Sequence, residues 1–294
     1  MKARSTSWRG KVSSSDWPEN KTGVRGPVHS VLVNVIPDAD AKRLRAGIQK
    51  NKKNGLDSRL RGNDNKGLKR SKMLIDLNYP TPVPVELDAA QTLLLIIDME
   101  NENAHPDGAL FIGESVRRII PKIARLREDV RRAGGRIVHT QSVRSPDALE
   151  FTVFKNTVRK VEGTWGAELI EEFKPAAGEP LIVKRTHDCF YRTELDSLLE
   201  RFGLRPGEGR VIVTGISTRN CVQSAVMGFS VRDYHVYVPM DCTAHRDEKE
   251  VLQAFSLFTS FGYKHNVTMT RSDLIGLRPS SGVIRLNCGA DRRR

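Results

Sequence analysis

The sequence lacks three features that would each have defined a class of protein. It has no apolar run of about 18 residues or more, so no membrane-spanning helix is expected. The most apolar early stretch, residues 28–36, is short, contains polar residues and has no small-residue cleavage pattern, which argues against a secretory signal. Close CxxC pairs are also missing, so the few cysteines predict reduced thiols in the cytoplasm rather than a disulfide framework. The cysteines are Cys189, Cys221, Cys242 and Cys288.

Acidic residues are scarce at the start of the chain, and this accounts for most of its basic character. The net charge is +13, and residues 1–72 hold 18 Lys and Arg against 6 Asp and Glu, a net of +12. Residues 73–294 are therefore close to neutral. The basic character of the whole chain gives no reason to expect nucleic acid as a partner of the folded part.

Sustained hydrophobic periodicity is absent from residues 1–72, which are rich in Ser, Asn, Gly, Lys and Arg. This composition predicts a disordered basic leader. Residues 45–65 resemble the translation of a dispersed bacterial intergenic repeat, which favours a mis-assigned start and Met73 as the natural first residue. A passive tail and a basic arm for an anionic surface are the alternatives. We expect one hydrolase domain over residues 73–278 and a flexible tail over 279–294.

From residue 93 onward, short buried strands alternate with helical patterns. Strict β–α alternation predicts an α/β fold with three layers and a doubly wound, mostly parallel, Rossmann-like sheet of six strands. The expected strands are residues 93–97, 136–140, 181–184, 211–214, 235–239 and 267–269. The expected helices are residues 115–133, 165–173, 194–202, a helix that begins at Cys221, and 248–261.

Three chemically active side chains follow strands of this sheet. Asp98 and Lys184 stand at the ends of two strands, and Cys221 follows a third after a polar turn. Because the carboxyl ends of parallel strands share one edge, we expect the three to converge. A cysteine at a helix start is favoured as thiolate by the helix dipole. An acid, a base and a thiol together predict nucleophilic catalysis, in which Asp98 accepts the thiol proton and Lys184 stabilises both anions.

Four segments carry a resemblance to a known family. They are LLLIIDMEN around Asp98, GTWGAEL at residues 163–169, LIVKRTHDCFYRTELDSLL around Lys184, and VTGISTRNCV around Cys221. In this order they resemble the isochorismatase-like cysteine hydrolases, which include nicotinamidases, N-carbamoylsarcosine amidase, and ureidoacrylate and biuret amidohydrolases. The resemblance implies the isochorismatase-like hydrolase fold, with Asp98 as general base, Lys184 as the family's lysine and Cys221 as nucleophile.

The resemblance also implies a reaction. A non-proline cis peptide is expected at Ile216–Ser217, with the N–H groups of Ser217 and Cys221 as an oxyanion hole. Cys221 would attack the carbonyl of a small amide or ureide, ammonia or an amine would leave, and water would hydrolyse the thioester. No cofactor is expected, and the family implies a homodimer or homotetramer.

Some residues depart from the family pattern. Glu100 stands where a glutamine is usual, and Asn103 lies near the place of an aromatic residue, which could alter the pocket wall. The nicotinamidase metal site needs an Asp and histidines after the second strand, where this sequence offers His139, expected to be packed inside the strand. No metal is therefore expected. Retention of Cys221 favours C–N cleavage over the vinyl ether hydrolysis of true isochorismatases, which stays an alternative, as does an inactive family member that acts as a binding module.

The residues that bind the substrate are less defined than the catalytic ones. Arg144 could hold a carboxylate or be a surface arginine, and Trp165 and Phe190 could equally be core residues. Two rival functions are a Cys221–His245 hydrolase oriented by Asp241, and a phospho-receiver switch. The substrate-binding candidates are Gln141, Arg144, Trp165, Phe190 and Tyr191.

Overall fold

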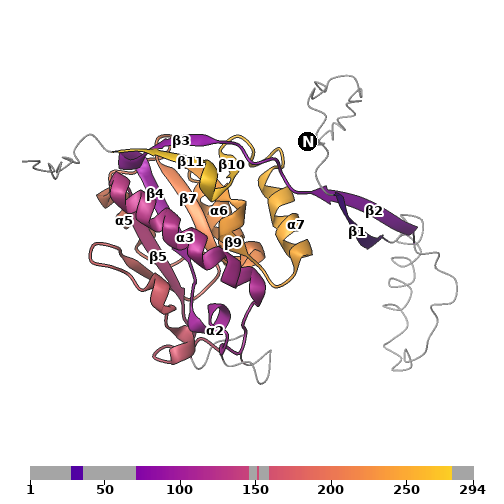
Figure 1. Cartoon of the computed structure of the whole chain (residues 1–294), viewed down its shortest axis with the longest axis horizontal. Helices are drawn as coiled ribbons and strands as arrows, with labels where there is room; N and C mark the ends of the chain where they lie inside the picture. Colours follow the sequence, from indigo (N-terminus) through magenta and orange to yellow (C-terminus); the bar gives the residue numbers. More distant parts are fainter. Residues whose placement is uncertain (1–27, 36–70, 146–150, 152–158, 280–294) are drawn as a thin grey trace, which may run out of the picture.

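The computed structural model describes residues 28–35, 71–145, 151 and 159–279. Its body is a parallel sheet covered by helices on both faces (Figure 1), as the sequence predicted. Six strands lie in the order β10-β8-β7-β4-β5-β6, and a short β9 (Thr243–Ala244) pairs with the end of β7. The six are β4 (Thr92–Ile97), β5 (Arg136–Ser142), β6 (Leu181–Lys184), β7 (Arg210–Ile216), β8 (His235–Pro239) and β10 (Val267–Thr270).

The central strand β4 is buried along its whole length and apolar from Leu93 to Ile97, because helices cover both of its faces. Leu93, Leu95 and Ile97 pack in one core with α5 (Leu195–Arg201), α6 (Gln223–Ser230) and α7 (Glu248–Phe258). The alternate residues Leu94 and Ile96 pack in a second core with α3 (Glu114–Ala133). A continuous buried run of this kind is the expected signature of a parallel strand between two helical layers.

The segment expected to form a helix over residues 165–173 instead forms two 3₁₀ helices, η2 (Trp165–Ala167) and η3 (Glu171–Phe173). The residues between them are extended because they pair with the chain after β4. Leu169 bridges Glu100, and the Ile170 amide donates to the Met99 carbonyl at 2.9 Å. The helix α7 likewise ends at Phe258, short of the expected residue 261.

The strand β7 continues through Gly215 to Ile216, two residues beyond the expected end at residue 214. The φ of Gly215, 103°, lies in the region that favours glycine. A Cβ at this position would lie 2.2 Å from the carbonyl oxygen of Ile97. Glycine therefore permits β7 to lie against β4 at the point where the chain turns into Asp98.

Two small sheets lie outside the main one. The strand β3 (Val85–Asp88) pairs in parallel with β11 (Ile275–Arg278), and both were unforeseen. The strands β1 (Val28–Val35) and β2 (Ser71–Asn78) pair with each other in antiparallel fashion, although residues 1–72 were expected to lack structure (Figure 1).

The other residues of the predicted leader and most of the predicted tail lie outside the described residues. The domain limits 1–72, 73–278 and 279–294 therefore stay predictions. Within the described part of the chain, no helix is both long and apolar enough to cross a bilayer.

Candidate active site

The structure brings together the three residues expected at the edge of the sheet. Asp98 follows β4, Lys184 is the last residue of β6, and Cys221 lies in the π-helical turn η4 (Thr218–Val222) that follows β7. The Lys184 Nζ atom is 2.6 Å from Asp98 Oδ2 and 3.3 Å from Cys221 Sγ. The lysine therefore lies between the carboxylate and the thiol and can stabilise negative charge on either.

The Asp98 carboxylate is fixed from two sides. Thr140 donates its hydroxyl to Oδ1, and Lys184 donates to Oδ2. The Asp98 backbone has a φ of 51°, a left-handed conformation that few residues other than glycine, Asn and Asp adopt. Such an uncommon conformation, held by its surroundings, is frequent at functional sites.

The charges of the site determine which group holds a proton. Burial alone would raise the pKa of Asp98, but the Lys184 and Lys160 ammonium groups outweigh burial and hold this pKa below its usual value. Burial and the charge of Asp98 raise the pKa of the Cys221 thiol to about 12. Burial would also lower the pKa of Lys184, but Asp98 and Cys221 keep it above its usual value. The free site thus contains a carboxylate, an ammonium and a neutral thiol.

The expectation that the helix dipole makes Cys221 a thiolate is wrong. The α-helix α6 begins at Gln223, and Cys221 precedes it in the π turn, where burial is the dominant influence on the sulfur. A nucleophile must then be generated by removal of the thiol proton, and Asp98 is the adjacent acceptor. Single turns of π-helix are themselves frequent at functional sites.

The peptide bond between Ile216 and Ser217 is cis, as the resemblance predicted. After it, the Ser217 carbonyl accepts hydrogen bonds from the amides of Asn220 and Val222, at 3.0 and 3.3 Å. The Asn220 side chain donates to the Ser217 hydroxyl at 3.0 Å. Ser217, Asn220 and Cys221 line the same pocket. The oxyanion hole of Ser217 and Cys221 stays a prediction.

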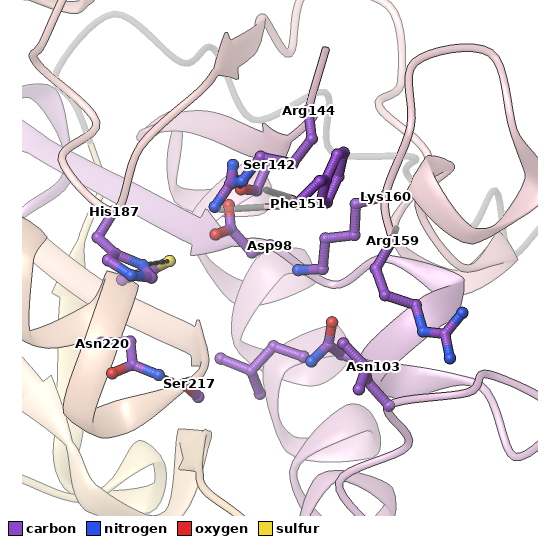
Figure 2. A pocket seen from close by; sticks show the side chains of 13 residues that line it. Asp98, Asn103, Ser142, Arg144, Phe151, Arg159, Lys160, His187, Ser217 and Asn220 are labelled. Atoms are coloured by element: carbon purple, nitrogen blue, oxygen red, sulfur yellow. Dashed lines mark hydrogen bonds between the residues drawn. The ribbon is translucent and has the colours of Figure 1, made fainter. Parts of the chain in front are cut away.

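A cavity of about 390 Å³ opens over Asp98 and Cys221, a size suited to a small ligand. Figure 2 shows its polar side chains, with His187 beside the sulfur and Lys160 extending toward Asp98. The His187 Nδ1 atom is 3.3 Å from Cys221 Sγ. Arg144 and Arg159 also line the pocket. Cationic and neutral donors therefore surround the reacting atoms.

Sequence reasoning missed His187, Lys160 and Arg159 as residues of the pocket. A signal existed for His187, because it stands three residues after Lys184 and thus near the same edge of the sheet. No local pattern marked Lys160 and Arg159, which belong to the long stretch without periodicity after β5.

Of the five predicted substrate-binding residues, Arg144 alone lines this pocket. Phe190 belongs to the core instead, where its ring packs on Phe229 and under the Arg232 guanidinium. Gln141 donates its side-chain amide to the Ala167 carbonyl at 2.7 Å. Trp165 and Tyr191 are 48% and 51% exposed and lie outside the pocket wall.

The rival arrangement with His245 does not form. His245 Nδ1 accepts a hydrogen bond from the Asp247 amide. The Asp241 carboxylate accepts from Ser272 and lies 3.4 Å from the Lys122 ammonium. His245 and Asp241 line a different pocket from that of Cys221. Cys221 has His187, not His245, as its imidazole neighbour.

His139 is buried within β5, as the sequence predicted. Its Nε2 atom is 2.9 Å from Glu179 Oε2, and Glu179 also accepts from Arg127 Nε at 3.0 Å. The one histidine near the end of β5 is thus already bonded to a carboxylate. Over residues 71–145 and 159–279, no group of three or more His, Cys, Asp or Glu side chains is arranged to hold a metal ion.

Replacing Glu179 with glutamine is expected to lower the free energy of unfolding at pH 7 by about 3 kcal/mol, because Arg127 is left buried without its carboxylate. Burial would raise the pKa of Glu179, but Arg127, His139 and Arg131 lower it to about 2. A depressed carboxyl pKa stabilises the fold above the unfolded value of about 4.3, and this contribution is lost as the pH falls toward 2.

The difference in the free energy of unfolding between the wild-type protein and Glu179→Gln should therefore have its full size at pH 7 and become smaller below about pH 4. Urea denaturation at pH 7, 4 and 3 measures it. Glu171→Gln is the control, because its pair with Lys174 is exposed. A difference that stays constant from pH 7 to pH 3 would count against this linkage.

Comparison with known proteins places these residues within one matched span. The Isochorismatase domain family model matches residues 92–271. A ureidoacrylate amidohydrolase of Methylorubrum extorquens is 31% identical over 212 residues, which cover 63% of this chain and 84% of the relative. That of Stutzerimonas stutzeri is 29% identical over 213 residues, with 63% and 84% covered.

Solved structures share the fold. N-carbamoylsarcosine amidase from Thermoplasma acidophilum has a TM-score of 0.53 and 26% identity, with 62% of this chain and 97% of that chain covered. An isochorismatase-like hydrolase from Alkaliphilus metalliredigens has a TM-score of 0.54 and 28% identity, with 62% and 96% covered. A nicotinamidase from Bacillus subtilis, with a TM-score of 0.54, 21% identity and 62% and 99% coverage, shows likeness in fold alone.

Proposed function

The chain belongs to the isochorismatase family of hydrolases, and we propose that it cleaves a C–N bond of a small amide or ureide through a thioester on Cys221. The observation that supports this most directly is the position of Lys184 between Asp98 and Cys221, at 2.6 and 3.3 Å. A buried thiol beside a carboxylate kept ionised is suited to generating a nucleophile on demand.

The proposed reaction uses Asp98 as the carrier of one proton. Asp98 takes the proton of Cys221, and the thiolate attacks the carbonyl carbon. The oxyanion accepts hydrogen bonds from the N–H groups of Ser217 and Cys221. When the C–N bond breaks, Asp98 returns the proton to the leaving nitrogen. Asp98 then deprotonates water, which attacks the thioester, and the proton returns to Cys221 as the acid product leaves.

Lys184 keeps its charge throughout this cycle, because its pKa lies above the usual value. Its ammonium faces the carboxylate before the proton transfer and the thiolate after it. The lysine thereby offsets the cost of moving a negative charge from Asp98 to the sulfur inside a site of low dielectric constant.

The cations of the pocket favour a substrate that carries a negative charge. Arg144, Arg159 and Lys160 line the pocket that contains Cys221. The curated relatives are named for ureidoacrylate, an acid with a ureido group. We therefore infer a small ureido acid, with its ureido carbonyl at Cys221 and its carboxylate at Arg144, whose planar guanidinium suits a carboxylate.

Replacing Arg144 with methionine is expected to raise KM for a ureido acid by about 10- to 100-fold, because a charged hydrogen bond to the carboxylate is lost, while kcat changes little. Initial rates of ammonia release measure both constants. For the methyl ester of the same substrate, which carries no carboxylate, the rise in KM should be far smaller.

Arg185→Met is the matched control for this variant. Arg185 is exposed, bonds to Glu162 and lies outside the pocket wall. An equal rise in KM for the charged acid and for its neutral ester would contradict the proposal that Arg144 binds the carboxylate.

The proposed function is tested by measuring ammonia release from a panel of small amides and ureides, with Cys221→Ser as the control. Mass spectrometry of the quenched reaction should detect an acyl group on the Cys221 peptide. Hydrolysis of a vinyl ether by the Cys221→Ser protein would favour the isochorismatase-type alternative. Tight binding of a ureido acid without turnover would favour a binding module. Assembly as a homodimer or homotetramer and a cytoplasmic location stay predictions.

A further inference from the structure

A second ammonium–carboxylate pair lies beside the first. Glu100 is fully buried two residues after Asp98, and its side chain has two partners. Oε1 accepts from the Ser142 amide at 2.6 Å, and Oε2 accepts from Lys160 Nζ at 2.9 Å. The Lys160 side chain is 16% exposed. Its segment is fixed as well, because the Lys160 carbonyl accepts from the Arg144 amide at 2.9 Å.

The pair of Glu100 and Lys160 is expected to add little to the stability of the fold. Removing two charges from water costs several kcal/mol per ion, and a buried pair often recovers no more than that. A glutamine at position 100 would accept from Ser142 with the same shape and would need no lysine. What the pair adds is a positive charge in the pocket wall that also contains Asp98 and Cys221.

We propose that Lys160, held in place by Glu100, is a positioning residue that acts on the reaction through Asp98 and Cys221. The inference rests on the proposed function for the role of Asp98 as base. Lys160 extends toward Asp98 in the pocket (Figure 2), and the Glu100 carboxylate fixes its ammonium there. Its attraction favours the ionised forms of both the carboxylate and the thiol.

The charges around Asp98 come from several segments and are balanced in pairs. Lys184 approaches from β6, Lys160 from the segment before η2, Glu100 from the start of α2 (Asn101–Ala104), and Cys221 from η4. His187 lies beside the sulfur, and burial lowers its pKa. Burial and the charge of Asp98 raise the pKa of Glu100, whereas Lys160 opposes that rise. Loss of Lys160 would leave two buried carboxylates with one ammonium.

The test measures the rate at which iodoacetamide alkylates Cys221 at pH 8, read on the Cys221 peptide by mass spectrometry. Lys160→Met should slow alkylation about 10-fold, because a shift of one unit in the thiol pKa changes the thiolate fraction tenfold. Glu100→Gln should accelerate it, because one buried negative charge near the sulfur is lost while the backbone of Lys160 stays fixed by its hydrogen bond with the Arg144 amide. In the double variant the two changes offset each other, and the rate should return close to that of the wild-type protein.

The exposed pair of Glu171 and Lys174, 2.5 Å apart, provides the matched control. Glu171→Gln and Lys174→Met should leave the alkylation rate unchanged, whereas Lys160→Arg should retain the wild-type rate by keeping the charge. The acid limb of kcat/KM for the substrate should also move to higher pH in Lys160→Met, by about one unit, because Asp98 must be ionised to act.

A structural role for the pair predicts a different pattern. The inference is overturned if folded Lys160→Met is alkylated at the wild-type rate, or if the double variant is as slow as Lys160→Met. Should Lys160→Met fail to fold, Glu100→Gln decides, because an unchanged rate in that variant also overturns it. Alkylation needs no substrate, so a protein that hydrolyses no amide but shows the expected order of rates would contradict the proposed function and not the role of Lys160.

Discussion

Replacing Cys221 with alanine is expected to reduce kcat/KM for the proposed amide or ureide substrate by about 10⁵-fold, because the proposed thioester can no longer form. The residual rate would come from binding and from stabilisation of the oxyanion. Ammonia release at saturating and limiting substrate measures the loss. The pocket itself should persist, so the variant should still bind the ureido acid with an affinity close to that of the wild-type enzyme.

Cys189 provides the matched control for this prediction. It is buried in the core beside the site, and burial raises the pKa of its thiol well above the usual value. Cys189→Ala should therefore retain activity within a few-fold of the wild type. Activity above about 1% in Cys221→Ala, against the loss expected of a missing nucleophile, would exclude the acyl-enzyme mechanism.

The second large effect is expected from Lys184→Met, which removes the ammonium between Asp98 and Cys221. The free energy of unfolding at pH 7 should fall by about 3–5 kcal/mol, because Asp98 is left buried without its partner. Asp98→Asn combined with Lys184→Met should recover much of this loss, since neither charge of this pair then stays buried. Urea denaturation of the single and double variants measures the difference.

The pH dependence of this loss follows from the two pKa shifts. The depressed pKa of Asp98 stabilises the fold above its unfolded value of about 3.9, and the raised pKa of Lys184 stabilises it below about 10.4. The difference between wild type and Lys184→Met should thus be largest near neutral pH and narrow toward both extremes. Lys264→Met is the control, because Lys264 is exposed. A double variant no more stable than Lys184→Met would contradict the charge argument.

The sequence predicted the layers and the convergence of Asp98, Lys184 and Cys221 because these follow from general rules. Runs of apolar residues that alternate with amphipathic helices require a parallel sheet covered on both faces, and such a sheet gathers its strand ends at one edge. The four motifs identified the family correctly, as the match over residues 92–271 confirms. The cis peptide at Ile216–Ser217 was predicted from the resemblance alone.

The failures share one physical cause, which is that contacts distant in sequence overrode local patterns. Lys160 pairs with Glu100 from a segment without periodicity, so no local signal joined them. The stretch near Leu169 becomes extended because it bridges Glu100. Phe190 was expected in the pocket because it is an aromatic residue close to Lys184 in the sequence, but its ring packs on Phe229 in the core. A lowered pKa was expected for the Cys221 thiol from its position near a helix start, whereas burial is the largest influence and raises this pKa.

The pairing of β3 with β11 extends the hydrophobic core beyond the span of the family match. The family match spans residues 92–271 and omits both strands. Yet Leu87 in β3 is buried in the core under α3, and Ile275 and Leu277 in β11 pack against the same core. A gene fragment trimmed to the matched span would therefore encode every proposed catalytic group while uncovering one side of the hydrophobic core. The packed core is therefore longer at both ends than the segment by which the family is recognised.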